Sequence, residues 1–385
     1  MSSVSVQVAV RVRPLNGREK KMKAKNIVEM EDKKTILRAP KGSGEKNATF
    51  TYDYSYSETA QNIQVFKDLG VGVLESAWEG YNVSLFAYGQ TGAGKSFSMV
   101  GYGENKGIIP LACAEMFARI GKNEDKNVKY IVESSMVEIY NEHVRDLFNP
   151  GNPNNSGGGL KVREHPKTGP YVEGVASLIV ADYEHIAQLM EEGTKARTVA
   201  NTNMNSTSSR AHTLFSIILK QITTDPISKT KSDRVSKINL IDLAGSERAS
   251  STGATGSRLK EGSAINQSLS ALGNCISALA KKSKKKKKKI FVPYRNSKLT
   301  WLLKESLGGN AKTIMIAAIS PADINFEESL STLKYADRAK KIKNKVSVNE
   351  DPSTKLIREL KEEIDALRKS LKSGGGSSSG SDEAA

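Results

Sequence analysis

Apolar and polar residues alternate strictly at the start of the chain, where valines occupy every second position from Val4 to Val12. Successive side chains of a strand point to opposite faces, so these valines would share one face of a single strand. Five further apolar runs have the length of strands, and they span residues 82–89, 130–140, 212–222, 236–245 and 313–320.

Segments with helical periodicity lie between these runs, at 59–79, 108–120, 183–198 and 261–281. This alternation predicts an α/β fold with a central mixed, largely parallel β-sheet flanked by helices. Two segments have the composition of loops, the Asn- and Gly-rich stretch 149–159 and the lysine run 281–289. Neither is flanked by a second core pattern, so we expect one domain over residues 1–340.

The pattern changes after this domain. A polar connector, 341–351, carries the apolar residues Ile342 and Val346, which we expect to anchor it to the domain. Over 352–372 apolar residues recur at the spacing of a coiled-coil seam, at Ile357, Leu360, Ile364, Leu367 and Leu371. Because two heptads are few, the seam predicts a weak or conditional dimer. Residues 373–385 have the composition of a flexible linker and resemble an added tail.

Charge along the chain is concentrated in one place. The 385 residues are 38% hydrophobic and 26% charged, which is typical of a globular protein, and the formal net charge is +16. Eight lysines within residues 281–289 supply half of that excess. A local cluster of this kind indicates a polyanionic partner, such as nucleic acid, an anionic membrane or an acidic protein surface.

The remaining composition narrows the class of protein. The two cysteines, Cys113 and Cys275, have no CxxC spacing, which favours a reducing compartment over a disulfide framework. The four histidines are not spaced as metal ligands. No signal peptide opens the chain, and no apolar run approaches the ~20 residues of a membrane helix. We therefore expect a cytoplasmic protein without direct membrane contact.

A phosphate-binding motif follows the apolar run 82–89. Residues Gly89–Ser96, GQTGAGKS, match GxxxxGK[ST] in the required position after a strand. Glycines let backbone N–H groups approach phosphate oxygens, Lys95 neutralises β/γ charge, and the Ser96 hydroxyl ligates Mg²⁺. The alternative, a chance glycine-rich turn, is disfavoured by the strand context and the complete spacing.

A second loop follows the apolar run 236–245. This run reaches Asp242, whose carboxylate can hold the water shell of Mg²⁺. Gly245, three residues later, could offer a backbone N–H to a γ-phosphate.

The hydroxyl-rich stretch 205–212 is a third element. Ser208 and Ser209 could reach the γ-phosphate and the metal, and Arg210 could pair with Glu247. Alone, such a loop is usually a solvated turn, but beside the other two elements it predicts a switch that senses the γ-phosphate. The guanine-reading NKxD is absent, because NKGI at 105–108 lacks the aspartate, and this favours adenine.

In this order, these segments resemble the kinesin motor domain over about residues 4–345. The matching stretches are RVRP (11–14), FAYGQTGAGKS (86–96), NSTSSRAH (205–212), LIDLAGSER (240–248), KEGSAINQSLSALGNCISAL (260–279) and VPYRNSKLTWLLKESLGGN (292–310). The lysine run and NEDPSTKLIRELKEEI (349–364) are most similar to the kinesin-3 transport class. The resemblance implies a microtubule-stimulated ATP hydrolase of the cytoskeleton that moves toward microtubule plus ends.

The resemblance also implies roles for individual residues. Adenine would be framed by Arg11, Arg13, Pro14 and Phe97. Phosphates would contact Gln90, Thr91, Gly92, Ala93, Gly94, Lys95 and Ser96, with Asn205 and Ser208 of the first switch. The metal would be held by Ser96, Ser209 and Asp242, and catalysis would involve Lys95, Ser209, Arg210, Gly245 and Glu247. The chain departs from the common family pattern at Ser96, Phe97 and Ala211, and none of these departures removes a role.

A microtubule partner explains the lysine run, because the C-terminal tails of tubulin are rich in glutamate. The expected microtubule contacts are Lys281, Lys282, Lys284, Lys285, Lys286, Lys287, Lys288, Lys289, Tyr294, Arg295 and Lys298. A solvated charge run without a partner is the simpler alternative. A P-loop ATPase acting on nucleic acid is disfavoured, since no aromatic residues interleave the lysines and no nucleic-acid module is recognised. A further alternative is a kinesin that binds microtubules without stepping, or depolymerises them; the intact switches and connector favour a motile protein over it.

Overall fold

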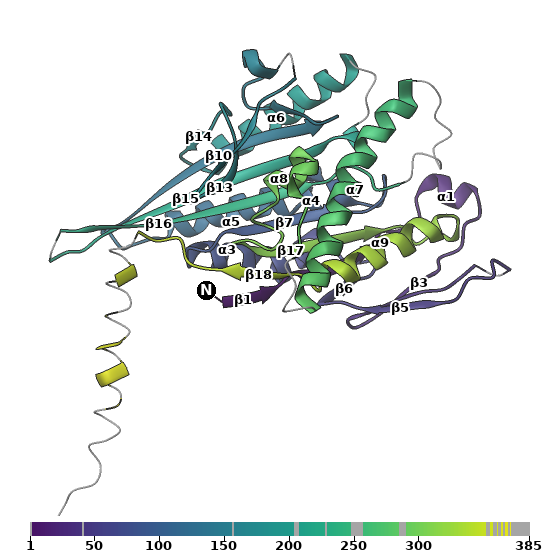
Figure 1. Cartoon of the computed structure of the whole chain (residues 1–385), viewed down its shortest axis with the longest axis horizontal. Coiled ribbons are helices and arrows are strands. Elements are labelled where there is room, and N and C mark those ends of the chain that lie inside the picture. The colour runs from purple at the N-terminus through teal and green to yellow at the C-terminus, as the bar shows by residue number, and fades with distance from the viewer. Residues whose placement is uncertain are drawn as a thin grey trace, which may run out of the picture.

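The computed structural model describes residues 2–40, 42–155, 158–203, 208–227, 229–247, 257–284 and 290–351, with scattered residues of 355–370. Its centre is a nine-stranded sheet. The strands are β2 (Gln7–Val12), β6 (Tyr54–Tyr56), β7 (Val83–Tyr88), β10 (Val128–Tyr140), β11 (His143–Asp146), β14 (Leu178–Val180), β15 (His212–Thr224), β16 (Lys231–Asp242) and β17 (Lys312–Ile319). Their order is β11-β10-β15-β16-β7-β17-β2-β6, and β14 also pairs with β10 (Figure 1).

The sheet is divided into a parallel and an antiparallel half. The pairings from β16 through β7, β17 and β2 to β6 are parallel. The pairings that join β11, β14, β10, β15 and β16 are antiparallel. The expected mixed sheet is thus confirmed, and its parallel half carries the phosphate-binding loop after β7.

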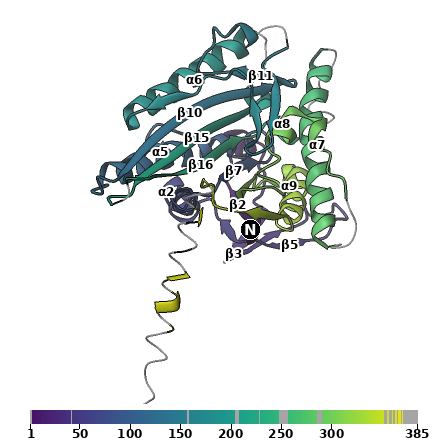
Figure 2. The same cartoon turned by 60° about the vertical axis from the view of Figure 1, so that its left-hand side comes forward.

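Helices cover both faces of the sheet (Figures 1 and 2). One buried cluster joins the sheet to α2 (Asn62–Val65), α3 (Val71–Trp78), α5 (Ile108–Gly121) and α6 (Tyr183–Asn203). The other joins it to α7 (Ser257–Lys284), α8 (Lys298–Leu302) and α9 (Phe326–Ala339). Along β7, Leu85 and Ala87 belong to the first cluster and Phe86 to the second. A strand buried on both faces reads as a continuous apolar run, which explains its sequence.

The smaller elements lie around this frame. Short helices are α1 (Gly17–Lys21) and α4 (Lys95–Met99), and a π-helical turn, Phe66–Gly70, divides the predicted helix 59–79 into α2 and α3. Small sheets comprise β3 (Val28–Glu31), β4 (Lys34–Leu37) and β5 (Ala48–Thr51), then β8 (Gly101–Tyr102) and β9 (Asn105–Lys106), and then β12 (Val162–His165) and β13 (Gly169–Val172). The prediction from sequence missed α9 and these small sheets.

The valine-rich start of the chain is two strands, not one, so that prediction was wrong. β1 (Ser2–Ser5) leaves the central sheet and pairs antiparallel with β18 (Lys343–Val346), which lies in the predicted connector. At the break, the Val6 N–H donates to the Ile342 carbonyl at 3.0 Å. The connector therefore forms a two-stranded sheet with the first residues of the chain, separate from the central sheet.

The lysine run was predicted to be a loop from Lys281 onward, and this was wrong for its first residues. Helix α7 continues through Lys284, while Lys285–Lys289 lie outside the described residues. Of the predicted seam, Leu360, Ile364 and Leu367 are described and exposed, and its remaining members lie outside the described part.

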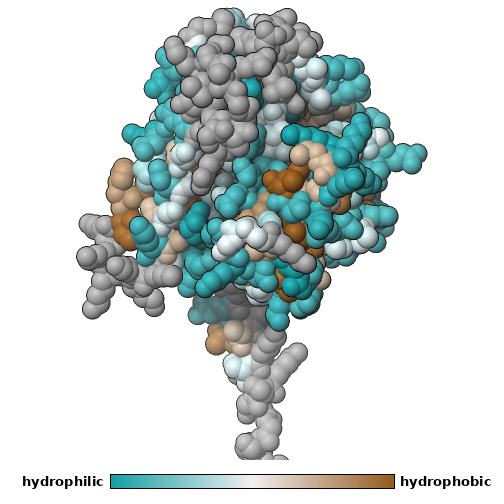
Figure 3. Space-filling view, turned by 90° about the vertical axis from the view of Figure 1, so that its right-hand side faces the viewer, coloured by the Kyte–Doolittle hydropathy of each residue, from teal (hydrophilic) through white to brown (hydrophobic). Residues whose placement is uncertain are grey.

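The described surface carries no sign of a membrane-spanning helix, since none of the described helices is long and apolar enough. The face turned to the viewer in Figure 3 is mostly hydrophilic outside the grey atoms, and its apolar areas are small and separate. Large contiguous apolar patches, which mark permanent interfaces, are thus absent from the visible coloured part of this face.

Candidate nucleotide-binding site

The phosphate-binding loop connects β7 to α4, at the edge where the parallel strands β7 and β16 end. Ligands of open α/β sheets bind at this edge. Gly92 and Gly94 have φ of +74° and +101°, in the left-handed region that a side chain disfavours. The loop borders a cavity of about 310 Å³, lined by Thr91, Gly92, Gly94, Lys95, Ser96, Phe97, Tyr102, Ser209, Asp242 and Leu243.

Lys95 is buried within the loop, as its predicted role requires. Its Nζ donates to the carbonyls of Gly89 at 2.8 Å and Gln90 at 2.9 Å. Burial lowers the pKa of Lys95, while the charges of Asp242 and Glu247 act in the opposite direction. The ammonium group is therefore held at the floor of the cavity among partners that favour its charged form.

Asp242 and Ser96 meet at the end of β16. The Ser96 hydroxyl donates to Asp242 Oδ2 at 2.5 Å, and Asp242 Oδ1 is buried without a hydrogen-bond partner among the described residues. Burial raises the pKa of Asp242, an effect that the Ser96 bond and nearby cations oppose. Buried carboxylate oxygens normally have a hydrogen-bond partner, so this oxygen is suited to binding a metal ion or another polar ligand.

These two groups fit Mg²⁺ in chemistry as well as in position. Mg²⁺ takes oxygen ligands, keeps several waters, and needs only one or two protein groups when phosphates complete its shell. The described residues contain no cluster of three or more His, Cys, Asp or Glu side chains that could hold a metal without such help. A metal here would therefore depend on the bound nucleotide.

The loop after β16 is tied to the other two loops of the site. Glu247 accepts from Thr91, at 2.8 Å from the backbone N–H and 2.5 Å from the hydroxyl. The Gly245 N–H donates to the Ser209 carbonyl at 2.9 Å. A Cβ on Gly245 would lie 2.2 Å from the Thr91 hydroxyl, so any larger residue would have to displace the Thr91 and Glu247 side chains.

Two expected roles involve groups that make other bonds in this structure. Glu247 bonds to Thr91 in this structure, so its pairing with Arg210 stays a prediction. The Gly245 N–H faces Ser209 and not an open phosphate position. Ser209 lines the cavity as expected, whereas Asn205 and the side chain of Ser208 lie outside the described part.

The residues expected to frame adenine lie in different environments. Phe97 lines the cavity together with Tyr102, and the two ring centres are 6.2 Å apart. Arg11 lies behind Phe97, with Cζ at 5.2 Å from the ring centre and the guanidinium in buried hydrogen bonds. Burial lowers the pKa of Arg11 to about 10. Arg11, Arg13 and Pro14 do not line the cavity, and Tyr102 is a lining residue that the sequence reasoning missed.

His212 is a second residue that the sequence reasoning missed, although it ends the matched stretch 205–212. The ring is buried, and Nδ1 accepts from the Ala244 N–H at 3.0 Å. Nε2 therefore carries the proton and donates to the Ser268 hydroxyl of α7 at 2.8 Å. Burial, followed by the charge of Lys95, lowers the pKa of His212 to about 3, so the ring is neutral.

The expected microtubule contacts have different environments. Lys281 and Lys282 are exposed on the last turn of α7. The Arg295 side chain is 74% exposed and lies 4.9 Å above the Trp301 ring, and Lys298 is half-buried. Tyr294 is oriented inward, since its hydroxyl donates to the Leu307 carbonyl, and burial raises its pKa. Tyr294 therefore supports this surface from inside.

The connector is packed on the domain at both predicted anchors. Ile342 is 0% exposed and Val346 is 1% exposed. Between them Asn344 is also buried, donating to the carbonyls of Ser306 and Ala311 while accepting from the Gly308 N–H. No sequence pattern distinguished Asn344, because its role depends on the carbonyls that the fold places around it.

Taken together, the loop after β7, the carboxylate at the end of β16 and the loops that touch both define a P-loop nucleotide-binding protein. Within that class, residues 11–342 match the family model described as the kinesin motor domain, and the chain belongs to the kinesin family.

Several proteins are similar to this chain over nearly all of its length. "Kinesin-related protein 1" of Dictyostelium discoideum is 57% identical, with 97% of this chain and 18% of that protein covered. "Kinesin-like protein unc-104" of Caenorhabditis elegans is 54% identical, with 96% and 24% covered. The chain thus spans about a fifth to a quarter of these relatives' lengths.

Solved structures are similar as well. A KIF14 dimer in its two-heads-bound state, with AMP-PNP and in complex with a microtubule, is 45% identical with a TM-score of 0.84, covering 93% of this chain and 100% of that one. The structure of a fast kinesin is 38% identical with a TM-score of 0.82, covering 91% and 95%.

Proposed function

We propose that this protein is a microtubule-stimulated ATP hydrolase that converts hydrolysis into movement along microtubules, toward their plus ends. The observation that carries the proposal is the set of bonds between the three loops around one cavity, Glu247 with Thr91 and Gly245 with Ser209. Loops that hold one another in this way can be rearranged by a single γ-phosphate. The similarity to a kinesin solved with AMP-PNP on a microtubule supports the choice of nucleotide and track.

Lys95, Ser96 and Asp242 hold the nucleotide in this proposal. Lys95 exchanges its carbonyl partners for phosphate oxygens, and Ser96 and Asp242 would hold Mg²⁺, since they offer a hydroxyl and an unpaired carboxylate oxygen. Mg²⁺, when bound, neutralises charge on the phosphates. The carboxylate of Asp242 is stabilised by that positive charge, which offsets the cost of its burial.

Hydrolysis then requires the loops to exchange partners. Glu247 leaves Thr91 and, with Ser209, orients the attacking water. As the water oxygen bonds to the γ-phosphorus, its proton passes to Glu247, and the bond from the γ-phosphorus to the bridging oxygen breaks, which releases ADP. The Gly245 N–H leaves the Ser209 carbonyl and donates to the γ-phosphate, where preorganised donors are most effective. Arg210 pairs with Glu247 in the closed arrangement. His212 transmits the movement of the Gly245 loop to α7, because its ring bonds both to Ala244, next to Gly245, and to Ser268 of α7.

The output of the domain is the packing of the connector, residues 341–351. In the structure it is docked by Ile342, Asn344 and Val346 and by pairing with β1. We assign this docked form to the force-producing state. The segment after it, residues 352–372, joins two chains weakly in this proposal.

The track-binding surface includes the end of α7 and the segment that follows it. Lys281 and Lys282 are exposed, and the other lysines of the run continue from them. We propose that the whole run attracts the acidic C-terminal tails of tubulin, and that Arg295 and Lys298 contact the tubulin body.

The test is co-sedimentation of the protein with microtubules or with DNA, with ATP or a non-hydrolysable analogue, combined with ATPase measurements. We expect microtubule binding that is tighter with the analogue, and ATPase activity that rises with microtubules. Preferential sedimentation with DNA, or an ATPase that microtubules leave unchanged, would contradict the proposal.

A further inference from the structure

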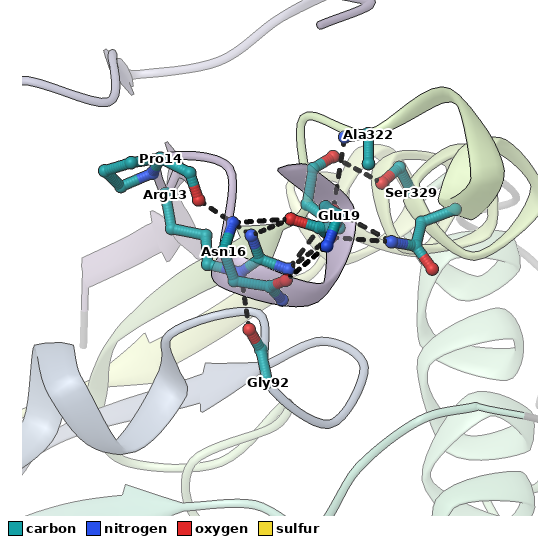
Figure 4. A network of polar contacts seen from close by, with 9 residues as sticks. Arg13, Pro14, Asn16, Glu19, Gly92, Ala322 and Ser329 are labelled. Atoms are coloured by element: carbon teal, nitrogen blue, oxygen red, sulfur yellow. Dashed lines mark hydrogen bonds and ion pairs between the residues drawn. The ribbon is translucent and has the colours of Figure 1, made fainter. Parts of the chain in front are cut away.

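Glu19, on the short helix α1, is a buried carboxylate outside the sites described above. It is 2% exposed, and it accepts from Arg13, from the backbone of Asn16 at the start of its own helix, and from a third segment, residues 320–325, that is distant in sequence (Figure 4). Arg13 donates to both of its oxygens at 2.6 Å. The backbone N–H of Asn16 donates to Oε2 at 2.8 Å, and Ser320 and Asn325 donate to Oε1 at 2.8 and 2.9 Å.

Arg13, the main partner of Glu19, has no polar donor left for a nucleotide. Its Nε donates to the Gly92 carbonyl at 2.5 Å, and its two terminal nitrogens donate to Glu19, to the Pro14 carbonyl at 2.7 Å and to Ser320 at 3.3 Å. A guanidinium has five N–H donors, and these bonds account for all of them. The Arg13 side chain is 16% exposed.

The third partner segment leads to the connector. Ser320 follows β17, and Asn325 immediately precedes α9. Helix α9 ends at Ala339, and the buried Ile342 follows it. Glu19 therefore accepts both from the arginine that touches the phosphate-binding loop and from the residue that precedes the helix leading to the connector.

We propose that Glu19 is a positioning residue that, through Arg13, fixes the phosphate-binding loop at Gly92 and joins this loop to the start of α9. The inference rests on the proposed nucleotide-binding function and gives Arg13 a role different from framing adenine. If Arg13 acts on the loop, it affects the phosphates equally whatever base they carry. If it frames adenine, its loss affects only nucleotides with that base.

The first experiment compares the binding of Mg-ADP and of inorganic tripolyphosphate to the whole chain by calorimetry. We expect E19Q to weaken both ligands by the same factor, roughly 10-fold, because one buried charge-assisted bond is lost. In an Arg13→Ala background E19Q should weaken them by less than a further factor of about 2, since the two residues act as one unit. The matched control is E29Q, whose carboxylate pairs with Arg38 at 2.5 Å on the exposed surface of the same N-terminal region. It should bind both ligands as the parent does.

The second experiment covers the case in which E19Q does not fold. Asn325→Ala removes one bond to Glu19 Oε1 and leaves the charge in place. We expect it to weaken tripolyphosphate binding several-fold in the parent and to have no effect in the Arg13→Ala variant.

Two results would overturn the inference. The first is that folded E19Q and Asn325→Ala both bind the two ligands as tightly as the parent does. The second is that E19Q loses affinity for Mg-ADP but binds tripolyphosphate as the parent does. A parent chain that binds neither ligand would instead contradict the proposed function itself.

Discussion

If docking of the connector, residues 341–351, produces force, then a variant that cannot dock it should hydrolyse ATP without moving microtubules. Ile342 and Val346 are both buried in the docked form, at 0% and 1% exposure. Replacing both with Ala avoids the extra backbone freedom that Gly would add and removes the buried part of each side chain beyond Cβ. Neither residue lines the nucleotide cavity, so hydrolysis should continue, and its rate should change far less than gliding.

The size of the docking defect follows from the buried carbon that is lost. Ile→Ala removes three carbon groups and Val→Ala removes two, which at ~0.8 kcal/mol each is about 4 kcal/mol. The undocked connector already covers part of this surface, so about 3 kcal/mol is a fairer value. Since 1.4 kcal/mol is a tenfold change in an equilibrium constant, the docked form should become about 100-fold less favoured.

The assay is microtubule gliding on a surface coated with the protein, with ATPase measured on the same preparation. We expect directed gliding to be lost in the double variant while microtubule-stimulated hydrolysis continues. The control is Lys343→Ala with Lys345→Ala, because these side chains alternate with the anchors on β18 and are exposed. Gliding velocity equal to that of the parent in the anchor variant would mean that force leaves the domain by another route.

Three further predictions concern the site, the track and acid stability. Glu247→Ala should retain ATP binding but slow hydrolysis by roughly 100-fold or more in single-turnover measurements, and near-normal turnover would remove Glu247 from water activation. Replacing Lys284–Lys289 with Ala should raise the microtubule concentration for half-maximal ATPase by about 10-fold or more and leave the maximal rate unchanged, with a gap that narrows as salt rises. Burial would raise the pKa of Glu19, but bonds from Arg13, Asn16 and Ser320 outweigh it and lower the pKa from 4.5 to about 2. The stability that Glu19 contributes, about 3 kcal/mol, is therefore complete above pH ~4.5 and is lost as the pH falls toward 2. E19Q should be less stable than the parent at pH 7 in denaturant titrations, by a difference that shrinks over that range; a difference independent of pH would contradict the assignment.

The parts of this fold that sequence predicted are those in which a local pattern has a single meaning. A continuous apolar run followed by GQTGAGKS places β7 and the phosphate-binding loop, and the apolar run 236–245 places β16 and its last residue, the carboxylate Asp242. The apolar residues Ile342 and Val346 stood out in a polar segment, and both are buried.

The parts that sequence did not predict depend on partners from distant segments. The alternating valines indicate extended structure, but alternation alone does not show that the chain breaks at Val6 and that β1 pairs with residues 343–346. From its sequence context, Glu19 would be an ordinary exposed residue of a short helix. It is buried because the fold places Ser320 and Asn325, which are distant in sequence, against its carboxylate. The role of the neutral His212 likewise depends on the fold, which brings Ala244 to one ring nitrogen and Ser268 to the other.

These distant partners place two connections between the nucleotide cavity and the connector. On one side, Gly92 is joined through Arg13 and Glu19 to Asn325, at the start of α9. On the other, Ala244, next to the glycine that would sense the γ-phosphate, is joined through His212 to Ser268 of α7. Helices α7 and α9 pack against each other, and Ile342 belongs to the buried cluster that contains Leu272 of α7 and Leu333 of α9. Because closely packed helices shift between discrete arrangements and do not deform continuously, the space for Ile342 depends on the relative position of both helices. Docking of the connector should therefore require that both sides of the phosphate site have closed, which would couple force production to the nucleotide and keep thermal movement of one loop from triggering it.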